Sequence, residues 1–153
     1  MIKVFGIGNI LLCDDGIGVK VMEAIKGNIE NYSGNVQVII GETNNIYCLD
    51  QIEKDDIVII VDSTYFSIEP GHVSTFTLDQ CDSFIDYSRD IHSDSLLKIL
   101  RREFREIRGY LIGIEIEKVD YSLELSRTLE DNFFNITEEV FKEIIRIVEL
   151  TKS

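Results

Sequence analysis

Apolar residues recur with two different periods along this chain, and the change of period marks the predicted elements. Short runs rich in β-branched residues predict four strands, at residues 2–6, 36–41, 56–62 and 110–116. The run at 56–62 is apolar on both faces, which is typical of a central strand in a parallel sheet. Residues 72–78 instead alternate polar and apolar side chains, so they predict an edge strand that can run antiparallel to the others.

Helices are predicted where apolar residues return every third or fourth position. This spacing predicts helices over 17–29, 96–104 and 129–147, and residues 46–52 predict a short one after a loop of helix-capping residues. Ser93 is a candidate cap for the third helix, and residues 79–92 are predicted to form a loop that carries His92. The order of elements predicts one domain, 1–153, with an α/β fold: a three-layer α/β/α sandwich on a mostly parallel, mixed five-stranded sheet.

Composition and charge narrow the expected environment and partners. The net charge of −13 repels phosphate backbones and anionic lipid surfaces, so we expect no nucleic acid and no membrane partner. A cationic peptide or a metal is better tolerated. The three cysteines, Cys13, Cys48 and Cys81, lack metal-site spacing, and the chain begins on a strand without a signal peptide. We therefore expect reduced, structural thiols, a cytoplasmic location and a monomer.

Three chemically capable side chains follow the ends of predicted strands or open a helix. Asp15 lies just after the first strand beside Asp14, Asp62 ends the third, and His92 precedes the next helix. Because ligands bind at the carboxyl ends of strands in open α/β sheets, these three could converge there. Two carboxylates and an imidazole suit a divalent transition metal with open positions, or a general acid/base group. Each acid could equally be a helix cap, and His92 could be merely exposed.

Four motifs resemble those of the hydrogenase maturation endopeptidases, in that family's order and over nearly the whole chain. They are GIGNILLCDDGIG at 6–18, IIVD at 59–62, DIHS at 90–93 and GIEIE at 113–117. The resemblance implies an endopeptidase that removes the C-terminal extension of a [NiFe] hydrogenase large-subunit precursor after nickel insertion. It also implies that Asp15, Asp62 and His92 are the catalytic and metal-contacting residues.

The resemblance does not say whether this chain or its substrate supplies the metal, or which group activates water for hydrolysis. A three-ligand site without a thiolate holds a metal weakly, so we expect the nickel to arrive with the substrate. The hydrolytic group is then either a metal-bound water or a carboxylate acting directly. One departure concerns Glu42: the family often has a second glycine there, and a charged side chain instead changes the predicted substrate groove.

Three other functions are compatible with parts of the pattern. Gly6 and Gly8 after a strand suggest a dinucleotide-binding loop, but the third glycine of that motif is replaced by Leu11, and Asp15 would repel a pyrophosphate. A non-catalytic metal- or peptide-binding module of the same fold is the main alternative. A cysteine peptidase using Cys13 is disfavoured, because neighbouring acids raise a thiol pKa.

Overall fold

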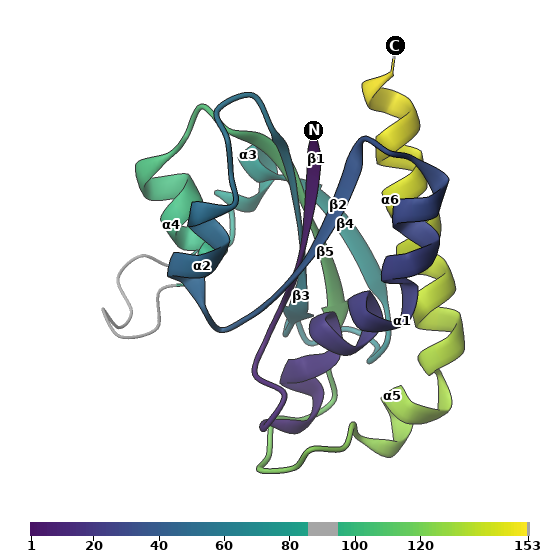
Figure 1. Ribbon diagram of the computed structural model, residues 1–153. Helices are drawn as coiled ribbons and strands as arrows, with labels where there is room; N and C mark the ends of the chain where they lie inside the picture. Colours follow the sequence, from purple (N-terminus) through teal and green to yellow (C-terminus); the bar gives the residue numbers. More distant parts are fainter. Residues whose placement is uncertain (86–94, 153) are drawn as a thin grey trace.

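Five strands form one sheet in the computed structural model, which describes residues 1–85 and 95–152 (Figure 1). The order across the sheet is β2-β1-β3-β5-β4. The strands are β1 (Ile2–Ile7), β2 (Val36–Glu42), β3 (Ile57–Thr64), β4 (Val73–Thr77) and β5 (Arg108–Glu115). Four are parallel, and β4 pairs antiparallel with β5 at one edge. The mostly parallel sheet, the central position of β3 and the antiparallel edge strand confirm the sequence predictions.

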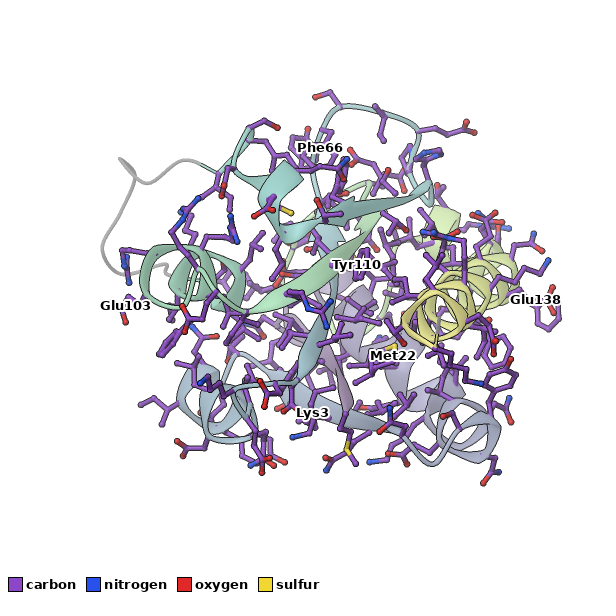
Figure 2. All side chains as sticks on the ribbon, turned by 90° about the horizontal axis from the view of Figure 1, so that it is seen from above. Lys3, Met22, Phe66, Glu103, Tyr110 and Glu138 are labelled. Carbon is purple, nitrogen blue, oxygen red and sulfur yellow. The ribbon has the colours of Figure 1, made fainter. Side chains whose placement is uncertain are left out.

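Helices cover both faces of the sheet, which gives the predicted three layers (Figure 2). The long helices α1 (Ile17–Tyr32) and α6 (Phe133–Thr151) lie on one face, and the shorter α2 (Asn45–Asp50) and α4 (Leu96–Glu103) lie on the other. Alternate residues of a strand point to opposite faces, so Val4 joins the core under α1 and α6 while Phe5 joins the core under α2 and α4. Both side chains are fully buried.

Three local predictions need correction. A short helix, α3 (Leu78–Cys81), begins where a loop was predicted, because Thr77 and Gln80 form a reciprocal capping box. The cap of α4 is Ser95, whose hydroxyl accepts from the backbone N–H of Lys98, rather than Ser93.

The third correction concerns the C-terminal helix, which divides into α5 (Arg127–Asp131) and α6. Asn132, between them, has φ −102° and ψ 6°, outside the helical region. Leu129 and Ile136 are nevertheless both buried. The apolar spacing therefore continues across the break, because it reports which side is buried and not whether the helix is continuous.

Hydropathy adds one more finding. In the part of the chain that the structure describes, no helix combines the length and the apolar character needed to cross a bilayer.

Candidate active site

The candidate site lies at the carboxyl ends of β1 and β3. These two strands are parallel neighbours. The connection that leaves β1 leads through α1 to β2 on one side of the pair, and the one that leaves β3 leads to β4 and β5 on the other side. The chain thus leaves these adjacent strands in opposite directions across the sheet, which is the topological switch point where open α/β sheets bind ligands. In Figure 1 these strand ends point downward, toward the edge where α5 lies.

Glycines allow the start of α1 to approach these strand ends closely. Gly8 has φ 140°, and a Cβ placed there would lie 2.0 Å from the carbonyl oxygen of Asp15. Gly18 lies in the first turn of α1, and a Cβ placed there would clash with the carbonyl oxygen of Val61 at 2.4 Å. The 3₁₀ turn η1 (Cys13–Gly16) therefore packs against the loop after β1 and against β3.

Asp15 and Asp62 meet through Ser63. The Ser63 hydroxyl donates to Oδ1 of Asp15 at 3.1 Å, and the Ser63 backbone N–H donates to Oδ1 of Asp62 at 2.7 Å. The backbone N–H of Asn9 donates to the other oxygen of Asp15 at 2.9 Å. Within the described residues, the hydrogen bonds that Asp62 accepts come from its chain neighbour Ser63.

The electrostatics of the pair favour an added cation. Although the Asp62 side chain is partly exposed, desolvation among the surrounding protein atoms raises its pKa to about 8. The Ser63 N–H opposes this rise in pKa, and the charge of Asp15 adds to it. In the described part of the chain, no Lys or Arg forms an ion pair with Asp15 or Asp62.

The structure therefore brings together two of the three predicted site residues. His92, the third, lies outside the described residues, so its place in the cluster stays a prediction. Within residues 1–85 and 95–152, no three His, Cys, Asp or Glu side chains form a group that could hold a metal ion. The predicted ligand set thus depends on His92.

Asp14, adjacent to Asp15, has a structural role. Its side chain is fully buried and accepts backbone N–H groups from Glu117, Lys118 and Ser126 at 2.7–3.1 Å. A carboxylate with three such donors satisfies the hydrogen-bonding needs of a loop more than 100 positions away. The spacing of the chain places both acids at one junction, and only the family resemblance singles out Asp15.

A second buried carboxylate, Glu115 at the end of β5, organises the loop that follows β3. It accepts from the hydroxyl of Thr64 at 3.0 Å and from the backbone N–H groups of Phe66 and Ile68. Sequence reasoning missed both this role and that of Ser63. Only the position of Ser63, directly after Asp62, could have indicated that it belongs to the site.

Two further residues lie near the site, Cys13 in η1 and Glu42 at the end of β2. Burial, followed by the charge of Asp14, raises the pKa of the Cys13 thiol, which makes Cys13 a poor nucleophile and agrees with its predicted packing role. Glu42 has φ 51°, a left-handed conformation that favours glycine, and its side chain is exposed. Its carbonyl oxygen accepts the N–H of Gly8, so the backbone at Glu42 supports the first loop of the site.

The chain matches the profile of a known protein family over most of its length. The family profile described as hydrogenase maturation protease (HycI) matches residues 19–151, which is most of the chain. The chain belongs to the hydrogenase maturation protease family. This membership confirms the resemblance found in the four sequence motifs.

Individual hydrogenase maturation proteins agree with the family match. The hydrogenase expression/formation protein HupD of Thiocapsa roseopersicina is 31% identical over 100 residues, covering 65% of this chain and 45% of that protein. This chain thus spans about half the length of that relative. A Methanocaldococcus jannaschii protein assigned to the hydrogenase maturation proteases is 28% identical over 152 residues, covering 97% of this chain and 92% of its own.

Solved structures share the fold. The hydrogenase maturating endopeptidase HybD from E. coli superposes with a TM-score of 0.73 at 24% identity, covering 95% of this chain and 92% of that one. At this identity, the likeness establishes the α/β fold and its topology.

Proposed function

We propose that this chain is an endopeptidase that removes the C-terminal extension of a [NiFe] hydrogenase large-subunit precursor after nickel insertion. Family membership supports the processing role. The observation that carries the proposal is the convergence of Asp15 and Asp62 on Ser63 at the switch point of the sheet. Nickel, held by the precursor as part of the substrate, meets these carboxylates and His92.

The two carboxylates differ in how firmly they are held. Asp15 accepts hydrogen bonds on both oxygens, from Asn9 and Ser63, so its orientation is set before substrate binds. In the described part of the chain, Asp62 is held by its own chain neighbour Ser63 alone. A nickel ion on the precursor gains oxygen ligands from this pair, and that binding holds the scissile peptide bond near the catalytic group. Precursor without nickel lacks this interaction and binds less well.

The test follows the mass of the released C-terminal peptide. Purified chain is mixed with precursor that does or does not carry nickel, and an unrelated unfolded protein serves as the control for general proteolysis. We expect rapid release only from the nickel-loaded precursor. Equal cleavage of both precursor forms, or digestion of the unfolded protein, contradicts recognition through nickel. Binding of the loaded precursor without release of peptide supports the non-catalytic alternative.

Substitutions in the site test the residues themselves. We expect Asp15→Asn, Asp62→Asn and His92→Ala each to reduce peptide release by at least about a hundredfold, in line with loss of a group that orients the reacting atoms. Asp55→Asn is the matched control, because Asp55 is an exposed acid at the opposite end of β3. Its rate should equal that of the wild type.

A further inference from the structure

Among the described residues, several exposed apolar side chains lie in the segments that follow the carboxyl ends of four strands. The set named here the apolar rim follows the carboxyl ends of β1, β2, β3 and β5, and each member is more than half exposed. Its members are Leu11 (57%), Ile46 (76%), Tyr65 (72%), Val119 (55%), Tyr121 (91%) and Leu123 (64%). Large apolar patches bordered by polar groups on a soluble domain mark interaction sites.

The backbone beneath half of this rim is held firmly. Asp14 accepts three N–H groups from the loop 117–126. Ser122, at the middle of that loop, donates its N–H to the carbonyl of Leu11 at 3.0 Å and accepts the N–H of Cys13 at 2.9 Å. These bonds keep Tyr121 and Leu123 beside Leu11 with their side chains in solvent. A surface arranged before binding loses less conformational entropy when a partner docks.

The charges around the rim indicate which partner fits. In the loop 117–126 the exposed charged residues are three acids, Glu117, Asp120 and Glu124, and one base, Lys118. Glu42 and Glu69, after β2 and β3, add two more exposed acids. Two copies of this face would bring like charges together, which disfavours self-association. A partner surface that is apolar at its centre and basic at its border complements it.

We propose that the apolar rim is the docking surface for the folded body of the large-subunit precursor. This inference rests on the proposed function, since the rim residues follow strand ends at the same edge of the sheet as Asp15 and Asp62. Contacts between the rim and the folded body of the precursor provide most of the binding affinity. The extension and the nickel then reach the two carboxylates. Tyr121 and Leu123 are the central contacts, because tyrosine is prominent among residues that dominate interface energies.

The experiment compares binding and cleavage by two matched variants. Tyr121→Ser combined with Leu123→Ser removes the centre of the rim, and Leu150→Ser removes an apolar side chain that is 52% exposed at the far end of α6. Affinity for nickel-loaded precursor is measured by surface plasmon resonance with Asp62→Asn added to each chain, so that no precursor is consumed. Cleavage is measured without that change, and melting temperatures confirm that each variant is folded.

We expect the double variant to bind about tenfold more weakly than the unmodified rim, with the loss in cleavage appearing in KM and not in kcat. Leu150→Ser should bind like the wild type. Equal affinity of the double variant and the wild type overturns the docking proposal, and so does a wild-type dimer that the double variant converts to a monomer. Rim-dependent binding by a wild-type chain that releases no peptide supports docking while contradicting the proposed peptidase.

Discussion

Asp14 and Asp15 are neighbours in the sequence, but their carboxylates contact different kinds of donor. All three hydrogen bonds at 2.7–3.1 Å to Asp14 come from backbone N–H groups, which cannot accept a hydrogen bond in return. Asp15 accepts one backbone N–H and one hydroxyl, from Asn9 and Ser63. A hydroxyl both donates and accepts, so the environment of Asp15 tolerates an amide and that of Asp14 does not.

The same substitution should therefore cost more stability at Asp14 than at Asp15. We expect Asp14→Asn to lower the free energy of unfolding by about 2 kcal/mol, because its amide group would face a buried N–H donor. Asp15→Asn should lower it by less than about 1 kcal/mol, because Oδ1 can accept from Asn9 while the new amide donates to Ser63. Urea denaturation of both variants measures the difference. Equal losses of stability would mean that Asp15 is also structural.

At the scale of elements, the approach of α1 to the sheet decides whether the site forms. Gly18 faces two backbone carbonyls, those of Val61 at 2.4 Å and Ile7 at 2.6 Å from the position of an added Cβ. Gly27 lies in the same helix, with no atom within 4 Å of such a Cβ. One glycine is required by packing, and the other only costs helix stability.

This contrast gives a matched pair of substitutions in α1. We expect Gly18→Ala to destabilise the fold by about 2 kcal/mol or more, because backbone atoms must move to admit the methyl group. Gly27→Ala should instead stabilise it by roughly 0.5–1 kcal/mol, since alanine favours the helix. Thermal or chemical denaturation checks both signs. A neutral Gly18→Ala would contradict the close approach of α1 to β3.

Charge pairing holds α3 against α4. Arg101 is buried, and its guanidinium donates to Asp82 at 2.8–2.9 Å and to Asp79 at 2.8 Å. The Arg101 hydrogen bonds, reinforced by Arg105, hold the pKa of Asp82 down to about 2 despite some desolvation. Because an unfolded aspartate titrates near pH ~4, Asp82 stabilises the fold above that pH and loses its contribution as the pH falls toward 2.

Acid titration of stability tests this pairing. We expect the melting temperature of the wild type to fall more steeply than that of Asp82→Asn between about pH 5 and pH 2. Other carboxylates also titrate in this range, so the difference between the two proteins is the informative quantity. Asp79→Asn is the comparison, because the Asp79 side chain is 90% exposed and water weakens its pairing with Arg101. Identical acid profiles for the wild type and Asp82→Asn would remove the assigned role.

At the scale of the whole molecule, the net charge of −13 acts against compactness. The 28 acidic residues outnumber the 15 basic ones, so the folded chain repels itself. Salt screens this repulsion. We expect raising the ionic strength from about 10 mM to 150 mM to increase the free energy of unfolding by roughly 1 kcal/mol and the melting temperature by about 2–4 °C. Calorimetry at several NaCl concentrations measures the change. A melting temperature that falls with salt would show that attractive pairs outweigh the repulsion.

Some of the site could be predicted because its signals are local. Strand β3 reads as buried on both faces, so its final acid could be placed at the carboxyl edge of a parallel sheet before any contact was known. The convergence of Asp15 with Asp62 is predicted from their places at strand ends, and in the structure Ser63, the neighbour of Asp62, donates its hydroxyl to Asp15. The part played by His92 stays a prediction, since it lies outside the described residues.

The amino-acid sequence by itself determined the strands, most of the helices and the edge of the sheet where acids gather, because burial of one or both faces imposes a period that needs no distant partner. Only the tertiary structure shows that Asp14 is structural, since its donors come from a loop more than 100 positions later. The apolar rim, likewise, exists only where strand order brings four separate connections to one edge. Contacts between segments far apart in the chain leave no periodic trace in either segment.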